Sequence, residues 1–414
     1  MLRRVPAWLG LFACALLLSA AVAHAEDDAE WEEVIRRLTE EVRQLPRRAT
    51  ARRELAVAHN NYAVNLAGRG DWQRATEHLA EAMQLEGDEQ FRKNLASVYL
   101  SRAHVEYNEH QLEASRDSVK LALEANPELA GAYALLGELE YGLQRLKEAK
   151  AAWERALELD PTLGDVSQRL GQLHSELPVE SKFERLSQAY FDVRHEDGVD
   201  RPLGIDVRSA LLEARRLIGS DFAYWPKYKV VVLLYTGAGF RAVREHSPTW
   251  LAGQYDGKIR VPVPSGNMDI KHVKQVVFHE YTHALIQDLA QGRCPTWLNE
   301  GLAEYEGARA NDQATRDRLA GAAAAEKLIP WAEIDERFRA TEAVEDVSLA
   351  YQQAHSIARY LIERYGFWRI RRVMKALAEG ASTEQALQDE FKLNITQLEA
   401  RWRQWLPSYV GQRS

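Results

Sequence analysis

Residues 269–291 read DIKHVKQVVFHEYTHALIQDLAQ, and residues 297–305 then read WLNEGLAEY. Apolar side chains recur through the first stretch at the three- and four-residue spacing of one helix face, which predicts a buried helix. His279 and His283 stand four positions apart in it, so their side chains differ by about 40° around the helix axis and about 6 Å along it. Both imidazoles therefore project from one face, where they can hold a single metal ion.

Glu280 adds a base to this face. It lies about 100° from His279 around the axis, where its carboxylate can reach a metal-activated water without taking a ligand position. A polar patch on a surface helix is the alternative, but the helix is too apolar for that. Two histidines and a glutamate on a core helix need partners, and Zn²⁺ suits them. A third protein ligand is still needed, and we expect residues 297–305 to supply it.

The motif H-E-x-x-H followed by W-L-N-E-G-L-A-E resembles the gluzincin metallopeptidases, among them aminopeptidase N and thermolysin. Residues 185–410 as a whole resemble the peptidase MA-like domains that are often fused to tetratricopeptide repeats. The resemblance implies that His279, His283 and Glu300 bind one Zn²⁺ ion and that Glu280 is the catalytic base. No glycine-rich exopeptidase motif is evident, so endopeptidase and exopeptidase action both stay open.

Further site residues are expected by analogy with these enzymes. Glu304, one helical turn after Glu300, is expected to orient His279, as in the E-x-x-x-D arrangement of thermolysin. The alternative is a solvated helix charge. Tyr351 is expected to stabilise the oxyanion, because related enzymes use a tyrosine or a histidine of the helical lobe. His355 is the second choice, and both residues could instead simply pack under their helix.

The stretch 253–263 predicts a strand next to the zinc-site helix. Its apolar residues alternate with polar residues or proline: Ile259, Val261 and Val263 against Lys258, Arg260 and Pro262. Because proline has no N–H for the ladder, we expect this strand at a sheet edge. An extended peptide could add to that edge, which makes Gly253, Gln254 and Tyr255 the candidate substrate-binding residues.

The rest of the second half is expected to form a small sheet with helices and then a helical lobe. Residues 188–193 and 228–235 read as strands, the second of them buried on both faces. Residues 206–218 read as a helix with an apolar face that consists of Val207, Leu211, Leu212, Ala214 and Leu217. From residue 269 to residue 406 the chain is expected to be almost entirely helical.

The first half carries a repeat. Residues 130–163 match the 34-residue tetratricopeptide pattern at Leu136, Gly137, Ala149, Trp153, Ala156 and Pro161. Weaker matches on both sides predict about three repeats over 51–177, with a register slip of about six residues after the first and a closing helix near 164–176. An amphipathic helix in 26–50 precedes them. The groove of such an array would bind a protein or a peptide, and a spacer or dimerisation arm is the alternative.

Residues 1–25 read as a secretory signal peptide, with Arg3 and Arg4 before an apolar run and Ala23-His24-Ala25 at the cleavage position. An uncleaved anchor and a lipoprotein at Cys14 are the alternatives. We expect an exported, periplasmic or extracellular protein without a later membrane span. Cys294 is then the one cysteine left and reads as a packing residue. The net charge of −8 argues against a nucleic-acid partner.

The sequence thus predicts a multidomain fold, in which a tetratricopeptide helical solenoid precedes a thermolysin-like domain of mixed α/β structure. The expected function is that of an exported zinc metallopeptidase, whose repeat array recruits or positions a protein substrate. The alternative is a tetratricopeptide adaptor in which the peptidase domain is inactive and serves to bind peptides. Every residue that hydrolysis requires is present, which favours the enzyme.

Overall fold

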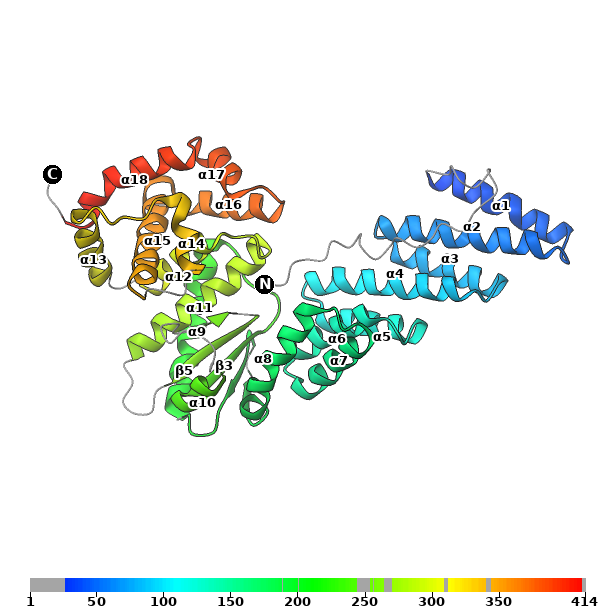
Figure 1. The fold of residues 1–414 in the computed structure, drawn as a ribbon, viewed down its shortest axis with the longest axis horizontal. Helices are drawn as coiled ribbons and strands as arrows, with labels where there is room; N and C mark the ends of the chain where they lie inside the picture. The colour runs from blue at the N-terminus through cyan, green and yellow to red at the C-terminus, as the bar shows by residue number, and fades with distance from the viewer. Residues whose placement is uncertain are drawn as a thin grey trace. The chain divides into compact units, whose positions relative to one another are not determined.

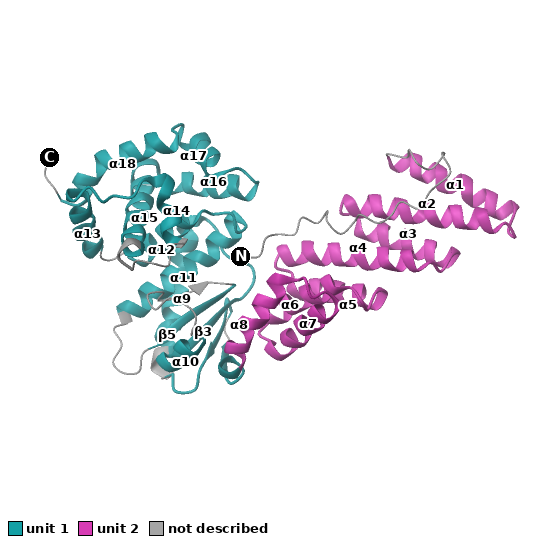
Figure 2. Ribbon diagram, in the orientation of Figure 1, with its two compact units in different colours: residues 1–2, 178–414 teal, residues 3–177 magenta. Residues whose placement is uncertain are grey.

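The structure is a computed structural model, and it describes residues 27–187, 189–199, 201–243, 254–255, 257–263, 270–308, 312–339 and 344–411. The chain divides into two compact units (Figure 2), of which one ends at Leu177 and the other begins at Pro178. This is the position at which the sequence pattern changes. Within the described part of the chain, every helix lacks either the length or the apolar character needed to cross a bilayer.

The first unit is helical. Its helices are α1 (Asp28–Gln44), α2 (Ala49–Gly68), α3 (Trp72–Leu85), α4 (Glu89–Asn108), α5 (Leu112–Ala125), α6 (Ala130–Gly142), α7 (Leu146–Leu159) and α8 (Gly164–Glu180), whose last three residues belong to the second unit. From α2 onward they form three successive helix pairs and a closing helix (Figure 1), as expected for a tetratricopeptide solenoid.

Gly137 shows why the third pair can pack so closely. A Cβ atom at this position would lie 2.2 Å from Cδ1 of Trp153, which is a distance that real side chains do not reach. The indole of Trp153 is fully buried between α6 and α7. A glycine facing a tryptophan thus sets the spacing of the two helices, in agreement with the expectation from the sequence.

The register slip of the repeats has a structural cause. The first helix of each of the first two pairs, α2 and α4, contains 20 residues, whereas α6 contains 13. The extra residues of α4 lie at its start, because its end and the following helix keep the 34-residue spacing to α6 and α7. A longer helix therefore displaces the first repeat in the sequence without changing how the pairs are built.

The second unit contains a small sheet and many helices (Figure 1). Its strands are β1 (Glu184–Ser187), β2 (Phe191–His195), β3 (Val230–Thr236), β4 (Gln254–Tyr255) and β5 (Lys258–Val263). Its helices are α9 (Arg201–Phe222), α10 (Gly237–Val243), α11 (Ile270–Ala290), α12 (Thr296–Gly307), α13 (Gln313–Ala324), the 3-10 helix η1 (Trp331–Glu333), α14 (Ile334–Arg339), α15 (Val344–Tyr365), α16 (Phe367–Ala378), α17 (Thr383–Phe391) and α18 (Ile395–Tyr409).

The described strands form one sheet in the order β1-β2-β3-β5-β4, with β2, β3 and β5 parallel and the two outer strands antiparallel to their neighbours. Alternate side chains of β3 join the main core with α9 and α11, as shown by buried Val230, Val232 and Leu234. Tyr235 points to the opposite face, where its ring lies 5.7 Å from that of Phe240 in α10. The sheet therefore has helices on both faces.

The prediction of one edge strand over residues 253–263 was wrong in the number of strands and in the position of the longer one. The structure has two strands there, and β5 lies inside the sheet between β3 and β4. The edge is β4, which pairs only with Ile259 and Arg260. Pro262 lies beyond this short ladder, so its missing N–H does not interrupt the pairing with β4.

The charged residues of β5 are buried. Lys258 and Arg260 are 1% and 2% exposed, although such side chains are rarely fully buried unless they are paired. Glu180 compensates for their burial, because its carboxylate lies 3.8 Å from Lys258 Nζ and 3.6 Å from Arg260 Nη2. Two other details also differ from the prediction: the strand expected over 188–193 runs from Phe191 to His195, and Leu212 of α9 is 42% exposed.

Candidate metal centre

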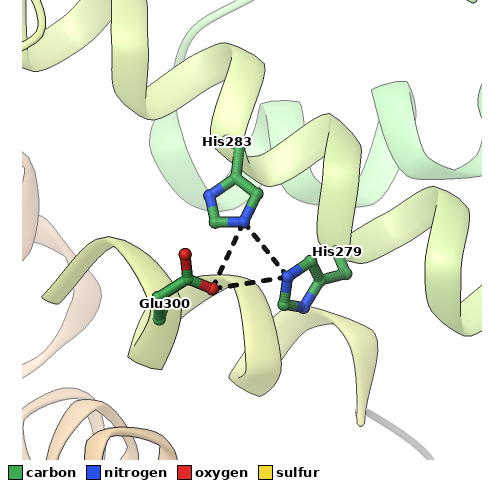
Figure 3. Close-up of side chains that lie close together, drawn as sticks. All are labelled: His279, His283 and Glu300. Carbon is green, nitrogen blue, oxygen red and sulfur yellow. Dashed lines mark hydrogen bonds and ion pairs between the residues drawn. The ribbon is translucent and has the colours of Figure 1, made fainter. Parts of the chain in front are cut away.

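Two adjacent helices bring together the three residues that the sequence singled out as metal ligands. α11 carries His279 and His283, and α12 carries Glu300. Figure 3 shows the two imidazoles and the carboxylate pointing toward one another. Nε2 of His279 lies 3.1 Å from Nε2 of His283, and Oε2 of Glu300 lies 3.6 Å and 3.5 Å from these two nitrogens. They form the one cluster of potential metal ligands found among the described residues.

The partners of the outer ring nitrogens determine the protonation of both imidazoles. Nδ1 of His283 lies 2.9 Å from the amide oxygen of Asn299, and Nδ1 of His279 lies 3.3 Å from a carboxylate oxygen of Glu304. Both oxygens are acceptors, so each Nδ1 carries a hydrogen and donates. In a neutral ring the other nitrogen then presents a lone pair. Two ring nitrogens and one carboxylate oxygen thus face a common point as acceptors.

The size of this triangle fits a zinc ion. Four ligands at zinc–nitrogen and zinc–oxygen distances of about 2.0–2.1 Å stand about 3.3 Å apart at the corners of a tetrahedron. The three observed separations of 3.1, 3.5 and 3.6 Å lie around this value. Two histidines and one carboxylate leave one corner of the tetrahedron for a water or a substrate oxygen.

The electrostatics of the cluster also favour a cation at its centre. Burial lowers the pKa of His279, but the carboxylates of Glu300 and Glu304 outweigh it and raise this pKa well above its usual value. Burial likewise lowers the pKa of His283, but the charge of Glu300 outweighs this effect, so the pKa of His283 is raised overall. For Glu300, burial raises the pKa, and the two imidazoles lower it by more, so the side chain stays ionised.

Glu280 and Tyr351 both lie close enough to the cluster to act on its charges. Glu280 is 2% exposed on α11, and its charge contributes to the raised pKa of both histidines. Burial is the main cause that raises the pKa of Tyr351 above its usual range. The negative charges of Glu300, Glu304 and Glu280 raise this pKa further. The ring of Tyr351 on α15 packs edge-on against Phe338 of α14, at 5.0 Å between centroids.

The remaining predicted residues are placed less directly. His355 is 2% exposed, and burial lowers its pKa. Gln254 and Tyr255 form the edge strand β4, whereas Gly253 lies outside the described residues. Cys294 is half-buried and packs against the main core, as expected for a packing residue.

Sequence reasoning missed three residues that position the ligand-bearing helix α12. Asn299 was quoted only as part of the motif, although an amide next to a ligand on the same helix is well placed to contact a neighbouring histidine. Asp335 accepts a hydrogen bond from the backbone N–H of Trp297 at 2.7 Å and so caps the start of α12 from another helix. Gly301 lies against α15, where a Cβ atom would stand 2.4 Å from the carbonyl oxygen of Ala354.

Comparisons with known proteins find one family match in each of the two units. Residues 248–408 match the family model of the Peptidase MA superfamily, and residues 130–163 match that of the tetratricopeptide repeat. No curated protein matches the chain. A solved structure entitled "First TPR of Spaghetti (RPAP3) bound to HSP90 peptide SRMEEVD" is similar at 22% sequence identity, over 30% of this chain and 93% of that chain, with a TM-score of 0.23.

The candidate ligands His279, His283 and Glu300 lie within the first of these matches. The fusion that the sequence led us to expect is therefore confirmed: the chain joins a tetratricopeptide repeat to a domain of the Peptidase MA superfamily.

Proposed function

We propose that the protein is an exported, zinc-dependent peptidase. The observation that carries the proposal is the triangle of acceptor atoms from His279, His283 and Glu300, which has the size and charge that one Zn²⁺ ion requires. Asn299 and Glu304 support it, because each accepts from the outer nitrogen of one imidazole and so holds the inner nitrogen toward the ion. Export to the periplasm or the medium rests on the signal-like residues 1–25.

Hydrolysis needs a base, an acid and a donor for the oxyanion, and the chain offers a residue for each. When bound, zinc supplies a Lewis acid that polarises a carbonyl and lowers the pKa of a water. Glu280 takes the proton from the attacking water and delivers it to the leaving amine. Tyr351 keeps its proton because of its raised pKa, so its hydroxyl can donate to the oxyanion.

The substrate would be a peptide in extended form. Among the described strands, β4 pairs on one side only, with β5, so its other side can accept an added strand. Backbone pairing of this kind holds a peptide without demanding particular side chains. The repeat array would bind a separate part of a protein substrate, or a partner that brings it, and so raise its concentration near the peptidase domain.

Zinc content and peptide cleavage, compared between the wild type and Glu280→Gln, test the proposal. We expect about one zinc per chain in both proteins, because Glu280 is not a ligand. Cleavage of a proteome-derived peptide library should fall at least about 10²-fold in the variant, since the proton transfer loses its base. Glu336→Gln, an exposed glutamate on α14, is the matched control and should cleave as the wild type does.

Two outcomes would count against this function. If the wild type binds zinc but cleaves no member of the library, the chain is an adaptor whose metal domain binds peptides without hydrolysing them. If zinc binding survives the loss of both His279 and His283, the ion is held elsewhere and the assigned site is wrong.

A further inference from the structure

The end of α15 and the following helix α16 carry a concentration of positive charge around an exposed tryptophan. Residues 364–378 include five cations and no Asp or Glu, in a chain whose net charge is −8. The cations are Arg364, Arg369, Arg371, Arg372 and Lys375. Trp368, near the start of α16, is 45% exposed, and the guanidinium carbons of Arg369 and Arg372 lie 4.7 and 5.8 Å from its ring centre.

Nearby carboxylates neutralise only part of this charge. Glu390 of α17 forms ion pairs with Arg369 and Arg372, and Glu379 lies 3.7 Å from Lys375. Arg364 and Arg371 form no ion pair with any residue that the structure describes. The exposed face of α16 therefore keeps a net positive charge, while its apolar face is buried in the core.

A second segment with the same chemistry meets this helix. Residues 223–229 read AYWPKYK, in which Trp225 is 46% exposed and Lys227 is also exposed. The indole N–H of Trp225 donates to the carbonyl of Arg215 at 3.1 Å, which fixes the ring along α9. The two segments lie next to each other, because the rings of Phe222 and Phe367 are 4.8 Å apart. Trp225 comes three residues after Phe222, and Trp368 directly follows Phe367.

Exposed tryptophans between lysines and arginines have the chemistry of a protein surface that binds at the interface of an anionic bilayer. Indole rings partition to the headgroup level, where their apolar body and polar N–H are both accommodated. Each basic residue near an anionic bilayer adds about 1 kcal/mol of attraction. A bilayer also needs no groove in the protein surface, which suits an exposed helix face. We propose that this corner, formed by residues 223–229, the end of α15 with Arg364, and α16, docks the protein on the surface of an anionic phospholipid membrane.

Sedimentation of the full chain with vesicles tests this proposal independently of peptidase activity. Vesicles of phosphatidylcholine alone are compared with vesicles of an equal mixture of phosphatidylcholine and phosphatidylglycerol. We expect preferential binding to the mixed vesicles, which weakens as salt is added. The variant R364A/R371A should reduce that preferential binding by about fivefold for each cation removed. W368A should reduce it as well, because the indole no longer enters the headgroup layer.

Matched controls separate the corner from the rest of the surface. R208A/K147A removes two exposed cations from α9 and α7 and should bind as the wild type does. L121A removes an exposed apolar side chain of the repeat unit and should likewise have no effect. Residues 1–25 are present in every variant, so they do not contribute to the differences between variants.

Three outcomes would overturn the membrane assignment. The first is equal binding to the neutral and the mixed vesicles. The second is unchanged binding of R364A/R371A to the mixed vesicles. The third is tight binding of a single-stranded oligonucleotide that R364A/R371A abolishes while vesicle binding stays undetectable, which would assign the corner to nucleic acid.

Discussion

At the scale of single side chains, Asn299 and Glu304 contact the two candidate histidine ligands from behind. Each accepts a hydrogen bond from the outer nitrogen of one imidazole and thereby fixes which ring nitrogen faces the centre of the cluster. Without such a partner a histidine can rotate or change its tautomer, and both changes weaken metal binding. Neither residue needs to touch the substrate to matter for activity.

Replacing Asn299 by alanine should therefore weaken zinc binding by about 10- to 100-fold, and Glu304→Ala should have an effect of the same order. The measurement is competition for zinc against a chelator of known affinity. Glu336→Ala, an exposed carboxylate on α14, is the control and should keep the wild-type affinity. Unchanged affinity in both site variants would show that these contacts do not orient the ligands.

His59 provides a second prediction at this scale. It is 9% exposed, and its Nδ1 lies 2.9 Å from Nδ1 of His78. Burial first, and then the charge of His78, lower the pKa of His59 from 6.5 to about 4. Above pH 6.5 the folded and unfolded states both hold this ring neutral. As the pH falls from 6.5 toward 4, only the unfolded chain takes up the proton, so the free energy of unfolding decreases.

The expected loss across that window is about 2–3 kcal/mol. Hydrogen exchange of amides in α2 and α3 of the full chain measures it, with amides of α16 as the internal reference. His59→Gln should remove most of the pH dependence, whereas His110→Asn, at an exposed turn, should leave it. A flat profile in the wild type would contradict the low pKa.

At the scale of elements, the spacing of α12 and α15 depends on Gly301. This glycine follows the ligand Glu300 directly, and a Cβ atom there would stand 2.4 Å from a backbone oxygen of α15. The overlap involves backbone on the α15 side, so it cannot be relieved by a rotamer change. Either helix must move, and Glu300 would move with α12.

Gly301→Ala should destabilise the second unit by about 1–3 kcal/mol and lower its zinc content. Thermal unfolding and metal analysis of the purified variant measure these two effects. The matched control is Gly321→Ala in α13, where a Cβ atom meets nothing within 4 Å. That change should instead stabilise the protein by about 0.5–1 kcal/mol. Similar behaviour of both variants would show that the close approach is not limiting.

Elements with strong periodicity were predictable from the sequence, and those that depend on distant partners were not. α11 and β3 were expected almost at their observed ends, because apolar side chains at helical spacing or in a continuous run reflect burial directly. β1 was missed because three of its four residues, ERLS, are polar and its one apolar residue, Leu186, is exposed, so burial leaves no pattern in its sequence. The interior position of β5 depends on a buried ion pair with Glu180, which the local sequence does not reveal.

The same distinction holds in the metal centre. The spacing of His279 and His283 follows from helix geometry alone, so the sequence sufficed for it. Asp335 and Gly301 act across helix contacts between segments far apart in the chain, and local pattern reasoning has no access to those.

At the scale of the whole molecule, the two units have separate hydrophobic cores, so a change in one core can be tested for its effect on the proposed role of that unit alone. If the repeat unit recruits protein substrates, damage to it should affect large substrates and spare small ones. Gly137 is a suitable site for a disruptive substitution, because a Cβ atom there would lie 2.2 Å from the buried side chain of Trp153.

Gly137→Ala should therefore raise KM for a protein substrate while kcat and KM for a short peptide stay as in the wild type. Gly171→Ala, in α8 with open space around it, is the control and should change neither substrate. Equal losses on both substrates would contradict a recruiting role. No loss on either would leave the array as a spacer.

The contact at Gly301 also limits how the Peptidase MA domain can be redesigned. An engineer who wants to widen the space around the candidate metal site cannot do so by shifting α12, since the carboxylate of Glu300 and the packing against Ala354 come from consecutive residues. Changes in substrate range must instead come from the segments around it, such as α14 with Phe338 or the edge strand β4. Variation in those parts can accumulate while the candidate metal ligands keep their positions.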